Sequence, residues 1–334
     1  MDAKITKKRL SRMLSYDWIK MVLVAAAIIV AWTLIFTMTA TRITPAQQYT
    51  VFNYEGNRPF NTTKFTKVYD DAYDRGIFSH EVLKATSYDM TTTGSNLHTV
   101  MDSRLQTDEG DAIFVSREGD PDFSIKDDDG NVIGHELTYL QTLILRYGYY
   151  LYDINEYLDY MKGYLNQYYG GDYETGVLDE KKVEEDFRAR EKNDKRFKTE
   201  KQKKAGVKKD IERIQKYRDA LVQFYVYLDV DKVISLEYTT IKAENEDGIE
   251  ETLIDNVAYS INLCPTKATE GLKNYAAYTK MVVDEKTGKK HYVESAENMQ
   301  LCLFKLKGVN KNFVGENLIF INEMVRLSLE ATKA

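Results

Sequence analysis

The chain has 334 residues, of which 43% are hydrophobic, so it is long enough for one or two packed domains. Its net charge is −6, but the first twenty residues hold six basic and two acidic side chains, which leaves the remainder more strongly acidic. An acidic main body gives no reason to expect nucleic acid as a partner.

An apolar segment follows the basic N-terminal tail, residues 1–20. Residues 21–39 carry no charge over 19 positions, and at about 1.5 Å per residue such a helix crosses roughly 30 Å of hydrocarbon. A chain within lipid has to satisfy its own backbone groups, so we predict a transmembrane helix over residues 21–41. The basic tail is expected to stay in the cytoplasm, which places the rest outside as a single-pass cell-membrane protein. The alternative is a cleaved signal peptide, whose apolar region is usually shorter, about 7 to 15 residues.

Strands and helices alternate after a spacer at residues 42–49. β-branched and aromatic runs predict strands, and apolar residues three and four positions apart predict helices. These elements are strands ending at Tyr54 and covering residues 81–90 and 112–115, with helices at 61–76 and 96–105. Their order over residues 50–134 favours an α/β lobe with a parallel sheet, in which ligands bind beyond the carboxyl ends of the strands.

Residues 135–230 change to a helical pattern and are interpreted as a helical lobe or insertion. Eleven of the 25 tyrosines lie between Tyr139 and Tyr173, and those at helical spacing are expected in the core or, less often, against a ligand. Residues 179–213 hold 14 basic and 10 acidic side chains, which suits a solvated helix or two. A docking surface for a membrane partner is the alternative. The basic excess of four stands out within an acidic body, and contact with anionic lipid or cell-wall polymer is conceivable, although no motif in the sequence supports it.

Residues 231–334 return to strands and end in an amphipathic helix. A hairpin is predicted over residues 280–293. Cys264 and Cys302 both lie in apolar, strand-like runs and are expected to be buried thiols, although neighbouring strands would allow them to pair.

Three patches resemble a known family. RLQTDEGDAIFVS (residues 104–116) and LYDINEYLDYM (151–161) are similar to the segments of type II extracytoplasmic solute-binding proteins of ABC transporters that enter the interlobe hinge and the second lobe. AYSINLCP (258–265), NMQLCLFKL (298–306) and ENLIFINEMVRL (316–327) resemble their return strands and final helices. The resemblance implies a two-lobed external domain that closes on a small polar solute, a carbohydrate being the expected class, with an ABC permease as partner.

The residues expected to line this site follow the predicted strands. They are Tyr54, Asn57, Thr92, Asn96, Ser116 and Arg117. No cofactor or catalytic group is predicted, because none of the four histidines has a two-histidine metal spacing. Residues 127–131 (DDDGN) are too short for an EF-hand loop and favour a hairpin turn. The alternative function is a non-catalytic scaffold, accessory or sensor protein that has lost its ligand and contacts other envelope proteins.

Overall fold

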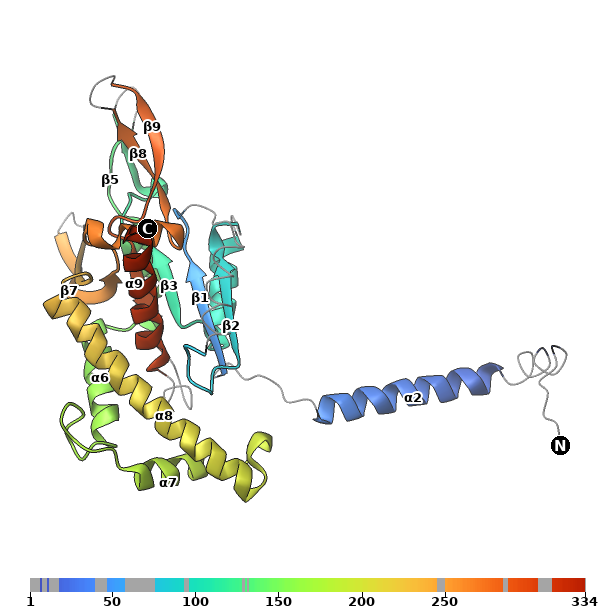
Figure 1. Ribbon diagram of the computed structural model, residues 1–334. Helices are drawn as coiled ribbons and strands as arrows, with labels where there is room; N and C mark the ends of the chain where they lie inside the picture. The colour runs from blue at the N-terminus through green and yellow to red at the C-terminus, as the bar shows by residue number, and fades with distance from the viewer. Residues whose placement is uncertain are drawn as a thin grey trace, which may run out of the picture. The chain divides into compact units, whose positions relative to one another are not determined.

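The computed structural model describes residues 7, 11, 18–39, 47–57, 76–92, 96–127, 130, 132–244, 250–284, 288–305 and 314–333. The chain divides into two compact units, residues 1–42 and residues 43–334 (Figure 1).

Among the described residues of the first unit, α2 is the one continuous helix, and it covers Trp18–Thr39. Its stretch Trp18–Phe36 has the length and apolarity of a membrane span or a signal anchor. The described side chains of this stretch are exposed within the unit, as a surface that faces lipid would be. The predicted apolar helix is therefore confirmed, and it begins three residues earlier than expected.

The second unit is built on a six-stranded sheet with the order β2-β1-β3-β10-β7-β6. Its strands are β1 (Gln48–Asn53), β2 (Lys84–Asp89), β3 (Ala112–Val115), β6 (Ser235–Glu244), β7 (Glu250–Asn262) and β10 (Gln300–Leu303). β1 runs parallel to both β2 and β3, as predicted. β10, β7 and β6 then pair antiparallel, so the sheet is mixed and not purely parallel. The predicted helix at residues 61–76 lies almost entirely outside the described residues.

The central strands are covered on both faces. β3 is buried at all four positions and β1 at five of six. Burial on both faces explains why β3 (AIFV) is a continuous apolar run without alternation; β1 also buries the polar Thr50 and Asn53. One core contains Val51 and Phe114 together with the tyrosine-rich helices, and a second contains Phe52 and Ile113 with α4 (Leu97–Gln106) and α5 (Tyr139–Tyr147).

The helical region is held to the sheet by long helices. They are α6 (Ile154–Asn166), α7 (Glu180–Arg190), α8 (Glu200–Tyr225) and α9 (Glu316–Lys333). Thr138 and Thr199 begin α5 and α8 with capping boxes, each satisfying backbone N–H groups that the first turn leaves free. Tyr147, Tyr157 and Tyr164 are buried, which confirms the expected core role for most of this tyrosine series, although Tyr160 is partly exposed.

Shorter helical turns connect these elements. They are η2 (Met90–Thr92), η4 (Pro121–Phe123), η5 (Gly148–Tyr150), η6 (Lys195–Phe197), the π-helical η7 (Val226–Val230) and η8 (Lys267–Asn274).

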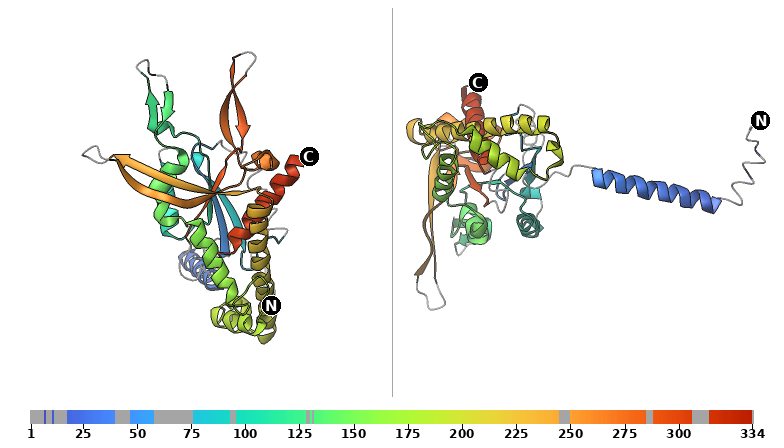
Figure 2. Two further views of the ribbon diagram at one scale, coloured as in Figure 1. Left: turned by 90° about the vertical axis from the view of Figure 1, so that its left-hand side faces the viewer. Right: turned by 90° about the horizontal axis from the view of Figure 1, so that it is seen from below.

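Two separate hairpins project from the unit. They are β4 (Ser124–Lys126) with β5 (Val132–His135), and β8 (Tyr278–Val283) with β9 (Lys290–Ser295). Both predicted hairpins are thus confirmed, although most of the turn at residues 127–131 lies outside the described residues. Figure 2 shows both ribbons extending from the same end of the unit, while the outer part of β6–β7 extends in another direction.

Candidate functional site

The carboxyl ends of β1, β2 and β3 meet at one edge of the sheet, where the sequence predicts a ligand site. Asn53, the last residue of β1, pairs with Asp89 in β2 and with Phe114 in β3. The Asn53 Nδ2 donates to Asp89 Oδ1 at 3.3 Å. Asn57 then turns back over this edge, because its Nδ2 donates to Asn53 Oδ1 at 2.7 Å and to the Phe114 carbonyl at 3.1 Å.

The structure brings three of the predicted site residues together at this edge, but it buries them. Tyr54, Asn57 and Ser116 are 1%, 5% and 0% exposed. Tyr278, the first residue of β8, forms an isolated bridge with Asn57 and covers the edge from outside. The edge is therefore closed by protein in this conformation.

The other three predicted residues lie apart from this buried group. Arg117 is exposed and its guanidinium lies 2.9 Å from a carboxylate oxygen of Glu237 in β6. Asn96 is exposed at the N-cap of α4 and makes no side-chain capping bond there. Thr92 ends η2 after β2, and its side chain lies outside the described residues.

Glu55, Asp120 and Asp122 form an acidic cluster beside the buried group, which was not predicted from the sequence. Burial raises the pKa of Glu55, and the negative charges of Asp120 and Asp122 raise it further. The Asp120 carboxylate accepts from Thr142 Oγ1 at 2.8 Å and from the Asp122 N–H at 3.0 Å. The available signal was the acidic loop REGDPD after β3, but its approach to Glu55 depends on the pairing of β1 with β3.

Aromatic side chains lie beside the acidic cluster. Burial raises the pKa of Tyr139 to about 12, with the charges of Asp120 and Glu55 adding to the effect. The Tyr139 ring packs directly on Gly56, whose φ is +78°, and a Cβ at Gly56 would lie 2.1 Å from that ring. Nearby, the His98 Nδ1 and the Tyr147 hydroxyl are 3.1 Å apart. Carboxylates beside aromatic rings can bind the hydroxyl groups and apolar face of a polar solute.

Within the part of the chain that the structure describes, two buried polar atoms at the edge have no hydrogen-bond partner, namely Asn57 Oδ1 and Ser116 Oγ. Most buried polar atoms in folded proteins are paired, so such atoms invite an explanation by water or a ligand. Their position at the carboxyl ends of the strands is where α/β sheets commonly bind ligands.

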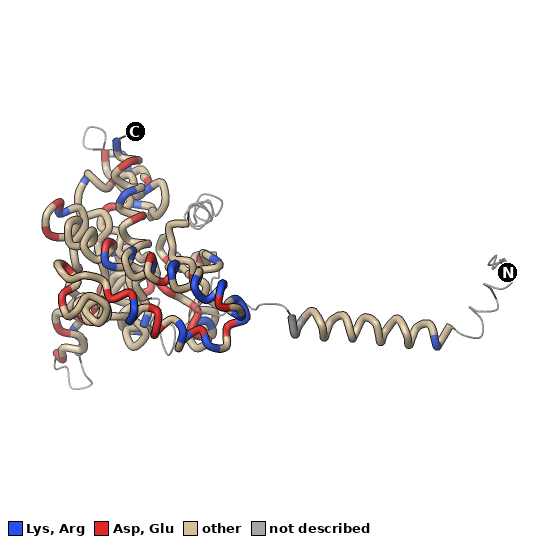
Figure 3. The backbone as a smooth tube through the Cα atoms, turned by 60° about the horizontal axis from the view of Figure 1, so that its bottom comes forward, with Lys and Arg blue, Asp and Glu red and all other residues tan. Residues whose placement is uncertain are grey.

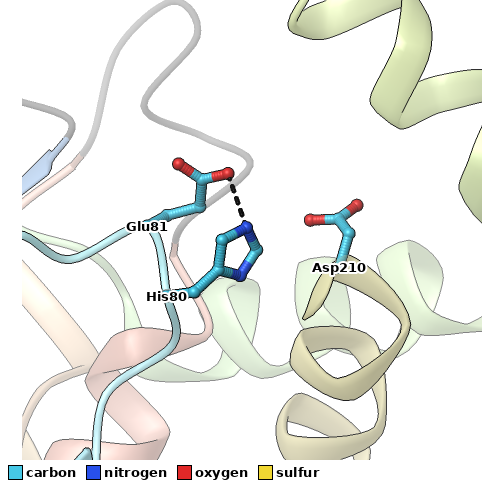
Figure 4. A group of neighbouring side chains, drawn as sticks. All are labelled: His80, Glu81 and Asp210. Atoms are coloured by element: carbon cyan, nitrogen blue, oxygen red, sulfur yellow. Dashed lines mark ion pairs between the residues drawn. The ribbon is translucent and has the colours of Figure 1, made fainter. Parts of the chain in front are cut away.

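A second cluster of chemically versatile side chains lies at the opposite edge of the sheet, before β2. Potential metal-ligating atoms of His80, Glu81 and Asp210 all lie within 4.8 Å of one another (Figure 4). A cavity of about 450 Å³, lined by His80 and Phe78 among others, adjoins them.

Three arginines already bind these two carboxylates. Glu81 Oε2 lies 2.8 Å from Arg196, while Asp210 Oδ1 lies 2.9 Å from Arg190 and 2.7 Å from Arg213. A divalent cation placed among these acids would face three guanidinium groups, so the donor set does not suit a metal. We define these five residues as the ion-pair cluster.

Electrostatics of the ion-pair cluster fit a structural role. Burial favours a higher pKa for Glu81, but its bonds to His80 and Arg196 outweigh burial and lower that pKa to about 2. Burial also favours a higher pKa for Asp210, but the charge of Arg213 opposes it, and the pKa of Asp210 is lowered. Both carboxylates are held ionised, as expected for buried acids with guanidinium partners. The cluster joins α7, η6 and α8 to the segment that leads into β2.

Comparison of the chain with protein-family models, with curated proteins and with solved structures finds no match.

Proposed function

We propose that the protein is a non-catalytic, membrane-anchored extracytoplasmic scaffold or accessory protein. Its interaction face would be the end of the sheet from which β4–β5 and β8–β9 project. One observation carries the proposal. At this end of the sheet the predicted ligand residues Tyr54, Asn57 and Ser116 are buried, whereas apolar side chains of the two hairpins are exposed. A closed strand edge with an exposed apolar patch suits protein contact better than capture of a small solute.

The β8–β9 ribbon has one apolar, exposed face. Met281 and Tyr292 are cross-strand partners, and Val283 lies two residues along the same strand as Met281, which places its side chain on the same face. All three side chains are exposed, Tyr292 by 74%. An isolated two-stranded hairpin is marginally stable in water, so a partner that covers this face would also stabilise the ribbon.

The β4–β5 ribbon contributes further apolar surface at the same end of the unit (Figure 2). Its exposed apolar side chains are Ile125, Val132 and Ile133, and Phe123 in the adjoining η4 is also exposed. The partner's complementary surface would be apolar, with acidic groups facing Lys289 and Lys290 beside Tyr292. Since α2 is proposed to hold the chain in the cell membrane with its N-terminus in the cytoplasm, the partner would be an envelope protein with an extracytoplasmic part.

Site-specific photocrosslinking in intact membranes tests this proposal. A photoreactive residue at Met281 or at Tyr292 should give the same adduct with one protein. Two controls are matched to these positions: His291 on the opposite face of β9, and Val177, which is 87% exposed in the α6–α7 connection. Equal labelling at the test and control positions, or adducts with unrelated proteins, would refute the proposed face.

Solute binding is the second candidate, and the unpartnered Asn57 Oδ1 and Ser116 Oγ favour it. In this alternative a polar solute, with a carbohydrate as the expected class, would open the edge beside the acidic cluster. The two-lobed arrangement, hinge closure and ABC permease implied by the sequence resemblance belong to this alternative. Thermal unfolding in the presence of sugars, oligosaccharides or amino acids tests this alternative. A solute that binds the folded state, added at 100 times its Kd, should stabilise it by about 2.7 kcal/mol and raise the unfolding temperature.

A further inference from the structure

The connection between α7 and α8, together with the first turns of α8, carries a dense positive charge on an otherwise acidic second unit. Residues 191–209 contain nine basic and three acidic side chains, and we call this segment the basic tip. Its exposed lysines are Lys192, Lys195, Lys198, Lys201, Lys204, Lys208 and Lys209. Figure 3 shows Lys and Arg gathered along this part of the unit. On α8, Lys201, Lys204 and Lys208 recur three and four residues apart and so share one exposed face.

The basic tip lies at the end of the unit where the chain enters from the N-terminal segment. Arg196 in the tip contacts Glu81 at 2.8 Å. Two residues further, the Leu83 N–H donates at 2.8 Å to the carbonyl of Gln47, which directly precedes β1. Figure 1 shows α7 and the adjoining part of α8 at the end of the unit opposite β8–β9.

Covalent geometry limits how far this end can move from the apolar helix. Eight residue steps separate Thr39, the last residue of α2, from Gln47. At 3.3 to 3.6 Å per step they reach at most about 29 Å. If α2 spans the membrane, the entry point of the second unit stays within that distance of the headgroups at the carboxyl end of α2.

The tip is held in a fixed shape. Arg190 and Arg196 connect it through the ion-pair cluster to the body of the unit. Gly206 permits close packing of α8 on α7, because a Cβ there would lie 2.3 Å from the Phe187 ring and 2.8 Å from the Phe197 ring. The lysines are therefore presented on a rigid support, which lowers the conformational entropy lost on binding a surface.

We infer that the basic tip docks on anionic lipid headgroups of the membrane in which α2 is anchored. The inference rests on the proposed membrane anchoring of α2, but not on the hairpin partner. Each lysine held near an anionic bilayer contributes about 1 kcal/mol, which changes the ratio of docked to undocked protein about fivefold. Loss of three lysines should then lower this ratio about 100-fold, and high salt should weaken docking because the Debye length shortens to about 3 Å at 1 M.

Energy transfer from the tip to the bilayer tests the inference on the full chain reconstituted in vesicles. Cys264 and Cys302 are both buried, so a cysteine introduced at the exposed Asn193 can be labelled selectively with a donor dye. Vesicles would contain either phosphatidylcholine alone or phosphatidylcholine with phosphatidylglycerol, each with an acceptor lipid. We expect higher transfer with phosphatidylglycerol, and loss of that increase in the triple variant Lys201→Gln/Lys204→Gln/Lys208→Gln.

The matched control is Lys289→Gln/Lys290→Gln, which removes two exposed lysines from the β8–β9 hairpin at the opposite end and should leave the transfer unchanged. Equal transfer in neutral and anionic vesicles would overturn the inference. So would equal transfer together with retention of a soluble glycerol-phosphate polymer that depends on the three lysines, since this would indicate wall polymer and not lipid. Crosslinking at Tyr292 is measured independently, so failure of the hairpin proposal is distinguishable from failure of this one.

Discussion

Asp111 should make the stability of the fold fall as pH rises from about 4 to about 7, and Asp111→Asn should remove that dependence. Asp111 is buried immediately before β3, and its Oδ2 accepts the Thr50 N–H at 2.6 Å. Burial raises the pKa of Asp111 from 3.8 to about 7; the Thr50 bond opposes this rise and the nearby Glu316 charge adds to it. An asparagine keeps the acceptor for Thr50 but carries no charge at any pH.

The magnitude follows from the two pKa values. Because the folded-state pKa is raised, the folded protein binds the proton more tightly than the unfolded chain between pH 3.8 and about 7. Stability from this group is fully present below pH 3.8 and is lost as pH rises through the folded value. At 1.36 kcal/mol per pKa unit, the loss by pH 8.5 is about 4 kcal/mol. The Asn variant should therefore match the wild type near pH 3.5 and exceed it by up to about 4 kcal/mol at pH 8.5.

Urea unfolding of the full chain in detergent, followed by circular dichroism, measures this difference. Tryptophan fluorescence is unsuitable, because Trp18 and Trp32 both lie in α2 and do not report on the sheet. Subtracting wild type from variant at each pH cancels the other carboxylates, including Glu81. Asp255→Asn, at an exposed position of β7, is the control and should change little at any pH. An Asp111→Asn advantage that does not grow between pH 3.5 and pH 8.5 would refute the reasoning.

Three further predictions concern packing, a buried hydrogen bond and the thiols. Gly206→Ala should destabilise the fold by about 1–3 kcal/mol, because its Cβ would lie 2.3 Å from the nearer of two phenylalanine rings. Gly163→Ala, where nothing lies within 4 Å of the new Cβ, should stabilise α6 by about 0.5–1 kcal/mol, and urea midpoints compare the two. Tyr217→Phe removes a 2.7 Å hydrogen bond to a buried glutamate and should cost about 1–3 kcal/mol by the same assay. Cys264 and Cys302 are free and buried, so both should react with a thiol reagent only as fast as the protein unfolds; fast labelling of either would contradict this.

The parallel pairing of β1 with β2 and β3 could be predicted, because each of these strands can be recognised from its own residues and the turns beside it. β1 is rich in β-branched and aromatic residues, β3 is a short apolar run between turn residues, and helix-like spacing separates β2 from β3. The position of β10 between β3 and β7 could not be predicted in the same way. It depends on contacts between residues nearly 190 positions apart, such as Leu301 opposite Phe114, and local periodicity carries no information on such pairing.

The predicted ligand residues illustrate a different limit. Tyr54 and Ser116 do follow the carboxyl ends of β1 and β3, so their place in the sheet was predictable. Whether a strand end is open depends on what crosses it, and here Tyr278 of β8 pairs with Asn57 over that edge. β8 begins more than 160 residues after Ser116, and nothing in the loops themselves indicates that it returns there.

Charge counting also misjudged part of the helical region. A mixed-sign segment predicts a solvated helix, and most of its lysines are indeed exposed. Arg213 instead has a side chain with 0% exposure and binds Asp210 at 2.7 Å. Fully buried arginines are rare and are tolerated when paired. Sequence composition cannot tell the few inward charges from the many outward ones, because both have the same residue types at the same local spacing.

The two proposed surfaces lie at opposite ends of one rigid sheet, and this geometry couples them. β1 spans six residues, or about 20 Å, between the edge where Gln47 enters and the edge bridged by Tyr278. If the basic tip holds the entry edge at the headgroups and the strands run along the membrane normal, the hairpins would begin about 20 Å from the bilayer, and the partner would need an extracytoplasmic part of that height. Loss of the tip lysines would let the second unit move about its short tether, which spreads the hairpins over a range of heights. Crosslinking from Tyr292 should then weaken without changing partner, whereas loss of the apolar face should abolish it and leave docking on lipid intact.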